Sequence, residues 1–311
     1  MNEPQILCDN LVKIYRVAHL EVFALQGVDL AINSGEMVAI VGASGSGKTT
    51  LLNILGGLDS PSAGTCRVAG RHLAQLNESQ RAAYRRSVIA YIWRQSGRNL
   101  VSDLTLAANV ELPMLLNRIG GRARARQVRD LLQLVGMADF ATRLPGQLSG
   151  GQQQRAAIAV ALANDPAIVL ADEPTGELDS ISAETIISLL RTLNQQLRLT
   201  IVVVTHDSAI AAHVDRTIAI RDGRASTETI RRSTSGQAIA EGVLPESAVI
   251  GLSAATHVES LVMDRVGRLQ LPKEALERIP YHGRVEARIL ADHVELWPLA
   301  QAPERLQSEQ A

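Results

Sequence analysis

Short runs of consecutive hydrophobic residues alternate with segments of helical periodicity along the first two thirds of the chain. Three of these runs, Val38–Val41, Val169–Ala171 and Ile201–Val204, are typical of strands that are buried on both faces. Helical patterns lie between them, at Thr49–Leu55, at Gln152–Ala163 and in the segment that begins at Ser180. Strands that alternate with helices predict an α/β fold, in which a parallel sheet is covered on both sides.

The hydrophobic pattern changes after residue 224, just beyond an Asp-Gly turn signal, and we therefore place a first domain at residues 1–224. Residues 225–245 are rich in Ser, Thr, Gly and Ala without sustained periodicity, which predicts a linker. Strand-like stretches return in residues 246–299 and predict a small, mostly-β C-terminal domain. Residues 300–311 are polar, and we expect them to be a disordered tail.

The composition is that of a globular protein, with 46% hydrophobic and 20% charged residues among 311. The 31 basic and 32 acidic side chains nearly cancel, so we expect no nucleic-acid partner. Cys8 and Cys66 are far apart in sequence and lack metal-binding spacing, which predicts buried, reduced thiols. The chain shows neither a signal-peptide pattern nor an apolar run of the ~18 to 20 residues that span a bilayer. We therefore expect any membrane role to come through a partner.

One segment has the spacing Gly-x-x-x-x-Gly-Lys-Thr and lies between an apolar strand and a helix. This is the P-loop pattern, in which backbone amides and the N-terminal end of the helix point at phosphate oxygens. We expect Lys48 to reach the β- and γ-phosphates of a nucleotide and the Thr49 hydroxyl to ligate Mg²⁺. The candidate nucleotide-binding residues here are Gly42, Ala43, Ser44, Gly45, Ser46, Gly47, Lys48, Thr49 and Thr50.

Two adjacent acidic residues, Asp172 and Glu173, follow the second buried strand. Ligands of open α/β sheets bind at the carboxyl ends of the strands, so we expect this pair beside the P-loop. Asp172 would support Mg²⁺, directly or through water, and Glu173 would orient or deprotonate the attacking water. Two such acids alone would more often be a solvated strand end; the P-loop favours the functional interpretation.

A second glycine-rich helix start, Leu-Ser-Gly-Gly-Gln at residues 148–152, resembles the signature of ABC ATPases. The resemblance implies a parallel-sheet core, an antiparallel β subdomain and a helical subdomain. It also implies that two subunits enclose two ATP molecules, each held by the P-loop of one subunit and the signature of the other. The implied contacts in trans are Ser149, Gly150, Gly151 and Gln152. The alternative is the glycine-rich N-cap of an ordinary helix.

The remaining ABC motifs are matched in order along the chain. The resemblance identifies Tyr15 with the aromatic residue that stacks on adenine and Asp179 with the D-loop, which crosses the dimer interface. It identifies Gln95 with the Q-loop glutamine, which contacts Mg²⁺ and the attacking water, and His206 with the histidine that contacts the γ-phosphate. The preceding Ile-Trp-Arg94 departs from the apolar-Phe pair that is commoner there. The alternatives are that Tyr15 is a core tyrosine and that His206 is a structural histidine.

Residues 4–224 carry this resemblance, which is closest to the ATPases of macrolide exporters and lipoprotein-releasing systems. It implies catalytic roles for Glu173, His206 and Gln95, with ATP and Mg²⁺ as cofactors. It also implies a homodimer, or a pair with a related ATPase subunit, on the cytoplasmic face of the cell membrane. The expected partner is an FtsX/MacB-like membrane permease on another chain. The alternative is a soluble ABC ATPase or a nucleotide-dependent regulator that is not coupled to transport.

The block at residues 263–279 resembles the swapped-hairpin domain of AbrB-like transition-state regulators. Gly267 would lie at a turn between two short strands, and Pro272 in the first turn of a short helix, Lys273–Ile279. Such domains dimerise by exchanging strands, and many bind DNA. From residue 225 onward, however, nine basic residues stand against twelve acidic ones, which disfavours phosphate binding. A dimerisation or regulatory module is the leading hypothesis, and DNA contact or a different small fold the alternatives.

Overall fold

The computed structural model describes residues 3–17, 20–207, 210, 212–231, 257–263, 269–271, 277–278, 285–289 and 294–298. Four strands form an antiparallel sheet: β1 (Ile6–Val17), β2 (Leu20–Ile32), β4 (Ala63–Val68) and β5 (Arg71–His72). Seven form the main sheet: β3 (Met37–Val41), β6 (Ile89–Ile92), β7 (Ile168–Asp172), β8 (Thr200–Thr205), β9 (Arg216–Arg221), β10 (Arg224–Arg231) and β11 (His257–Leu261). A separate pair consists of β12 (Val285–Ile289) and β13 (Val294–Pro298).

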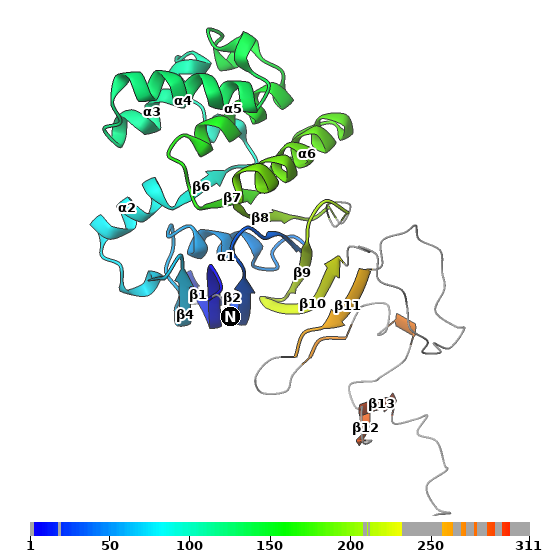
Figure 1. Ribbon diagram of the computed structural model, residues 1–311. Helices are drawn as coiled ribbons and strands as arrows, with labels where there is room; N and C mark the ends of the chain where they lie inside the picture. Colours follow the sequence, from blue (N-terminus) through cyan, green and yellow to red (C-terminus); the bar gives the residue numbers. More distant parts are fainter. Residues whose placement is uncertain are drawn as a thin grey trace, which may run out of the picture.

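The helices cover the two sheets from different sides. The α-helices are α1 (Lys48–Leu55), α2 (Glu78–Ser87), α3 (Leu106–Leu116), α4 (Gly121–Leu134), α5 (Gly150–Leu162) and α6 (Ser180–Leu197). The short 3₁₀ turns are η1 (Leu73–Gln75), η2 (Ser96–Arg98), η3 (Ala138–Phe140) and η4 (Pro145–Gln147). Helices α3 to α6 lie on one side of the main sheet, and α1 and the four-stranded sheet lie on the other (Figure 1).

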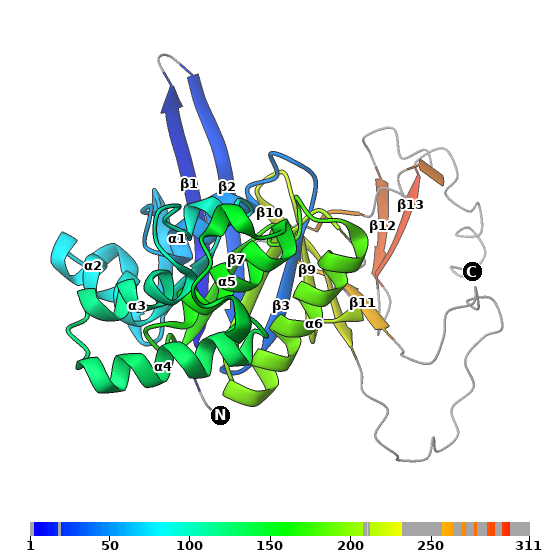
Figure 2. The ribbon, with the colours of Figure 1, turned by 90° about the horizontal axis from the view of Figure 1, so that it is seen from above.

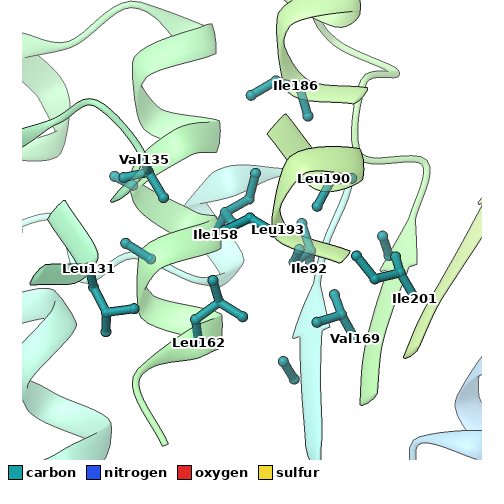
Figure 3. Close-up of a cluster of buried hydrophobic side chains, with 14 of the residues drawn as sticks. Ile92, Leu131, Val135, Ile158, Leu162, Val169, Ile186, Leu190, Leu193 and Ile201 are labelled. Atoms are coloured by element: carbon teal, nitrogen blue, oxygen red, sulfur yellow. The ribbon is translucent and has the colours of Figure 1, made fainter. Parts of the chain in front are cut away.

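The main sheet has the order β11-β10-β9-β3-β8-β7-β6, and its strands from β9 to β6 run parallel. Side chains of β3 alternate between two cores: Met37 and Ala39 face the helices α3 to α6, whereas Val38 and Ile40 face α1 and the four-stranded sheet. Figure 3 shows the first core, where Ile92, Val169 and Ile201 point from the strands toward α5 and α6. The predicted α/β fold with a covered parallel sheet is therefore confirmed.

The two small subdomains implied by the resemblance are both present. Strands β1 and β2 form a long antiparallel hairpin, which projects beyond the rest of the molecule (Figure 2). Helices α3, α4 and α5 pack on one another as a helical subdomain. The thiols of Cys8 and Cys66 are free and buried, as expected, and lie opposite each other on β1 and β4 with their sulfurs 3.6 Å apart. No helix in the described ranges is long and apolar enough to cross a bilayer.

The predicted linker is wrong for residues 225–231, which form most of β10. This strand pairs antiparallel with β9, and β11 pairs with its other edge. Ser and Thr residues form strands readily when a neighbouring strand supplies the pairing, so the polar composition concealed this one. Ser226, for example, is buried and donates its hydroxyl to the Ala219 carbonyl of β9. Residues 232–245 of the predicted linker lie outside the described residues.

The described C-terminal pieces agree with several predicted strands. Strand-like stretches are expected in residues 246–299, and the described strands β11, β12 and β13 lie in that range. Met263 and Leu269 form an antiparallel bridge, and the expected turn at Gly267 lies outside the described residues. The same is true of Pro272, of most of the expected short helix and of the tail at residues 300–311.

Candidate nucleotide-binding site

The P-loop connects β3 to α1 by a backbone path that two glycines make possible. Gly42 has φ 155°, and a Cβ added there would lie 2.2 Å from the Ile220 carbonyl oxygen. Gly47 has φ 102°, and its Cβ would lie 2.3 Å from the Ala24 carbonyl oxygen. Gly45 also has a positive φ, but no atom would lie within 4 Å of a Cβ on it. The loop therefore packs tightly against β2 and β9 on one side and faces open space on the other.

Lys48, the first residue of α1, is held inside this loop. Its Nζ donates to the carbonyl oxygens of Gly42 and Ala43, both at 2.8 Å, and the residue is only 6% exposed. Burial lowers the pKa of Lys48, although the nearby Glu173 and Asp172 carboxylates act in the opposite direction. The loop thus surrounds one buried cation.

Ser46 adds an unsatisfied group to the same loop. Its Oγ is buried without a hydrogen-bond partner in the described structure, a costly arrangement for a hydroxyl. A cavity of about 400 Å³ adjoins this part of the loop, and Gln270 and Leu271 of the C-terminal part also line it. An open loop face, a buried ammonium and an unpaired hydroxyl together fit an anionic ligand with several oxygen atoms.

The two side chains expected to hold Mg²⁺, Thr49 at the start of α1 and Asp172 at the end of β7, lie next to each other. Thr49 Oγ1 donates to Asp172 Oδ1 at 3.3 Å across the space between α1 and the end of β7. Burial raises the pKa of Asp172, the Glu173 charge adds to this, and Thr49 and Lys48 oppose it. Within the described residues no group of three or more His, Cys, Asp or Glu side chains is arranged so that it could hold a metal ion. One hydroxyl and one carboxylate fit Mg²⁺, which usually takes few protein ligands and completes its shell with water and phosphate oxygens.

Tyr15 lies on β1 opposite Val22 of β2, close to the turn end of the hairpin, and several contacts hold it. Its hydroxyl donates to Asp59 Oδ2 at 2.7 Å and contacts Thr50 of α1. The Lys13 ammonium binds the same carboxylate at 2.6 Å and lies 4.8 Å from the centroid of the Tyr15 ring. Burial, followed by the bond to Asp59, raises the pKa of Tyr15. The structure therefore joins Tyr15 to the P-loop helix through Thr50, and the adenine-stacking role stays a prediction.

Glu173 and His206 meet because β7 and β8 are parallel neighbours. Asp172 pairs with Val204, so the next residues of both strands emerge at the same edge of the sheet. His206 Nδ1 lies 3.0 Å from Glu173 Oε1, and both residues line a cavity of about 420 Å³. Glu173 has a left-handed backbone with φ 46°, fixed by its amide, which donates to the Val204 carbonyl at 2.8 Å. Two predicted catalytic residues are thus in direct contact.

Gln95 is not brought to this group of residues. Its side chain is exposed and makes no hydrogen bond in the described part of the chain. The neighbouring Arg94 reaches the site instead: its Nη1 donates to Glu173 Oε2 at 2.8 Å. Sequence reasoning did not place Arg94 at this site. The available signal was the arginine itself, at a place where the family more often has an aromatic residue.

The signature residues form a helix start of a different kind. Ser149 caps α5: its Oγ accepts from the Gln152 amide at 3.3 Å, and Gln152 Oε1 accepts from the Ser149 amide at 2.9 Å. A Cβ on Gly151 would lie 3.2 Å from Ser182 Oγ, at the start of α6. Asp179 caps α6 and accepts from the Ser182 amide at 2.9 Å. The signature and the D-loop therefore adjoin, and neither lines the cavity beside the P-loop.

Comparison with known proteins agrees with this geometry. Residues 25–176 match the family profile described as "ABC transporter". The lipoprotein-releasing system ATP-binding protein LolD of Chromohalobacter salexigens is 41% identical over 227 residues, which cover 73% of this chain and 95% of that protein. The chain belongs to the ABC transporter family. It is an ATP-binding and ATP-hydrolysing subunit of that family, as predicted.

Two further ABC proteins show how far the similarity extends. A macrolide export ATP-binding/permease protein, MacB 1/2 of Paracoccus denitrificans, is 48% identical over 200 residues; these cover 64% of this chain but only 30% of that protein. A dimeric post-hydrolysis structure of the ATP-binding cassette MJ0796, bound to ADP and Pi, superposes with a TM-score of 0.66 at 40% identity. That match covers 72% of this chain and 97% of the cassette. The residues beyond the shared part are therefore an addition to the ABC cassette.

Proposed function

We propose that two copies of this chain, or one copy and a related ATPase subunit, enclose two ATP molecules and drive a membrane permease on a separate chain. The observation that carries the proposal is that the chain has two glycine-rich helix N-termini suited to bind phosphate, at α1 and α5, and that they lie apart. The P-loop faces its own open space, whereas the signature at residues 149–152 adjoins the D-loop elsewhere on the surface. A second subunit would bring the two together, and the similar cassette MJ0796 is itself dimeric.

Each residue of the site has a role that suits its surroundings. Lys48 would bind the β- and γ-phosphates, and Ser46 would give its unpaired hydroxyl to a phosphate oxygen. Thr49 and Asp172 would hold Mg²⁺, which neutralises phosphate charge when bound. Glu173 would take a proton from the attacking water.

The other positions follow the resemblance and await a test. Tyr15 would stack on adenine, His206 would contact the γ-phosphate, and Asp179 would cross the dimer interface. Gln95 stays a prediction as a ligand of Mg²⁺ and water, because its side chain is exposed and has no contact with Glu173. Ser149 and its neighbours would hold the ATP of the other subunit.

The finer assignment is to ATPases that work with FtsX/MacB-like permeases at the cytoplasmic face of the membrane. It is supported by the names of the similar proteins: one belongs to a lipoprotein-releasing system and another to macrolide export. Copurification of the tagged chain from membranes, followed by identification of the bound chain by mass spectrometry, tests it. A permease with four membrane helices and a large external domain is the expected result. A cytosolic partner recovered in its place would favour the uncoupled ATPase or regulator.

Substitution of the proposed base is the direct test of the chemistry. Glu173→Gln is expected to lower steady-state ATP hydrolysis by about a hundredfold or more, because a proton acceptor is lost. ATP binding should persist, and light scattering should show an ATP-dependent dimer that no longer dissociates. Glu184→Gln is the matched control, since Glu184 lines the same cavity and is mostly exposed. Unchanged turnover in Glu173→Gln would rule out this carboxylate as the base.

For the C-terminal part we propose a dimerisation or regulatory role, in keeping with its AbrB-like pattern. Strand β11 belongs to the main sheet, so a clean deletion must retain it. A chain ending at residue 263 is expected to dimerise more weakly than the full chain without nucleotide, as measured by sedimentation equilibrium. Equal dimerisation of both chains would contradict the proposal.

A further inference from the structure

Arg94 joins the end of β6 to the segment that follows β7. It follows β6, and its guanidinium donates to Glu173 Oε2 at 2.8 Å and to the Gly176 carbonyl at 3.4 Å. Its Nε lies 3.8 Å from a carboxylate oxygen of Glu177. All of these contacts are to the segment that follows β7. The side chain therefore ties the end of β6 to the residues that contain the proposed base.

The Glu173 carboxylate is engaged on both of its oxygens. Oε1 faces His206 and Oε2 accepts the charged hydrogen bond from Arg94. Glu173 is only 20% exposed, so little of the carboxylate is open to water. A general base must hydrogen-bond the water whose proton it takes, and charge-assisted bonds are the strongest competitors for its lone pairs. Arg94 therefore occupies one acceptor site of Oε2 and competes with that water for this oxygen.

The contact is nevertheless one that can be released. Arg94 is 50% exposed, and an ion pair with a half-exposed partner contributes little net free energy because water competes for it. The backbone before it is anchored independently: the Trp93 amide donates to Asn99 Oδ1 at 3.1 Å, and the Trp93 carbonyl accepts from Gln154 Nε2 at 3.3 Å. The side chain of Arg94 can therefore leave Glu173 without unfolding the loop.

We propose that Arg94 is a positioning residue that holds the Glu173 carboxylate in the separate subunit, and that its release from Oε2 is required before water is activated. The proposal rests on the assignment of Glu173 as the base. In the free chain Arg94 thus limits hydrolysis that is not coupled to a partner. Glutamine at this position keeps a hydrogen-bond donor but loses the positive charge that attracts the carboxylate.

Steady-state hydrolysis by the full chain tests the proposal. Arg94→Gln is expected to raise kcat by about two- to fivefold, the effect of removing a half-exposed ion pair, with KM for ATP unchanged. Arg94→Lys, which keeps the charge, should restore most of the wild-type limit. Arg126→Gln is the matched control, because Arg126 also forms an exposed ion pair, with Asp130 on α4. It should leave kcat as it is.

Two results would overturn the proposal: a lower or unchanged kcat in Arg94→Gln, or a gain that appears in KM instead of kcat. Thermal unfolding of each variant shows whether a lower kcat reflects misfolding. If Arg94→Gln unfolds at a lower temperature than the wild type, its kcat is not decisive. Arg94→Lys then decides, because the proposal requires its kcat to stay close to the low wild-type value. Comparison of the two single variants, Glu173→Gln and Arg94→Gln, separates the two proposals. Full hydrolysis in Glu173→Gln alone refutes the base, whereas an inactive Glu173→Gln with a slow Arg94→Gln refutes only the role of Arg94.

Discussion

The chain contains two glycine-rich helix starts, and they are completed in opposite ways. At α1 the N-cap is Gly47, no side chain caps the helix, and the hydroxyl of Ser46 is buried without a partner. At α5 the N-cap is Ser149, which exchanges two hydrogen bonds with Gln152 in a capping box. We call the N-terminus of α1 the unfinished start, because it has no side-chain cap and leaves the Ser46 hydroxyl unpaired. We call the N-terminus of α5 the complete start, because its capping box is formed within the chain. The difference supports the proposal that the separate subunit binds nucleotide at α1, and that α5 contributes only after another molecule docks.

The largest effect is expected from Lys48→Ala, which removes the buried cation of the unfinished start. The affinity of the isolated chain for ATP should fall about tenfold to a hundredfold, since hydrogen bonds to charged groups are lost. Hydrolysis should fall with it. Isothermal titration calorimetry measures the binding, with Arg126→Gln as a control for the loss of a positive charge. Unaltered ATP affinity would show that the ligand site lies elsewhere.

Ser149→Ala probes the complete start. It should destabilise the fold by about 1 kcal/mol, because a helix cap is lost, and it should impair hydrolysis while ATP binding to the monomer is retained. Thr105→Ala is a matched control: Thr105 caps α3 by accepting from the Ala108 amide at 3.3 Å, far from any signature residue in sequence. It should cost the same stability and spare hydrolysis. Lost ATP binding in the Ser149 monomer would erase the contrast between the two starts.

Ser46→Ala should change stability and binding in opposite directions. Removal of a buried, unpaired hydroxyl is expected to leave the free energy of unfolding unchanged or to raise it by up to about 1 kcal/mol. ATP affinity should fall by about fivefold, because the hydroxyl no longer meets a phosphate oxygen. Chemical denaturation and calorimetry give the two values. A loss of stability would mean that the Ser46 hydroxyl has a hydrogen-bond partner in the free chain. The contrast between the N-termini of α1 and α5 would then be lost.

The smallest effect is expected in the pH dependence of folding stability, through Asp172 beside the P-loop. Burial and the neighbouring Glu173 raise the pKa of Asp172 above its ordinary value of 3.8. The folded chain then binds the proton more tightly than the unfolded chain, so the stabilising contribution is full below pH 3.8 and is lost as pH rises through the folded value. Asp172→Asn should therefore be more stable than the wild type at neutral pH, with the difference vanishing near pH 3.8. Denaturant midpoints across this range measure it, and a pH-independent difference would contradict the assignment.

Much of the sheet could be predicted because its strands are buried on both faces. The apolar run Val169–Ala171 differs from β7 by one residue at each end, since nothing polar interrupts such a strand. The contact of Glu173 with His206 follows from the same logic, because both residues come directly after parallel strands. Residues that directly follow two neighbouring parallel strands lie close together because the strands are paired in the sheet.

The sequence was less informative where a residue depends on a partner distant in the chain. Ser226 and its neighbours lie in β10 because β9 and β11 pair with that strand, and no local pattern announces such pairing. Arg94 and Gln95 are adjacent and both polar, so spacing could not decide which of them faces Glu173. The family pattern favoured the glutamine, and the structure brings the arginine to the carboxylate instead.

Strand β11 has a consequence for the handling of the chain. It is five residues long, is the border strand of the main sheet and covers the outer edge of β10. An uncovered strand presents a row of free amides and carbonyls that can template pairing between chains, and a short strand at the border limits this hazard. A protein truncated at residue 231 would expose the longer strand. Its first failure should then be aggregation during expression, with the catalytic residues still intact.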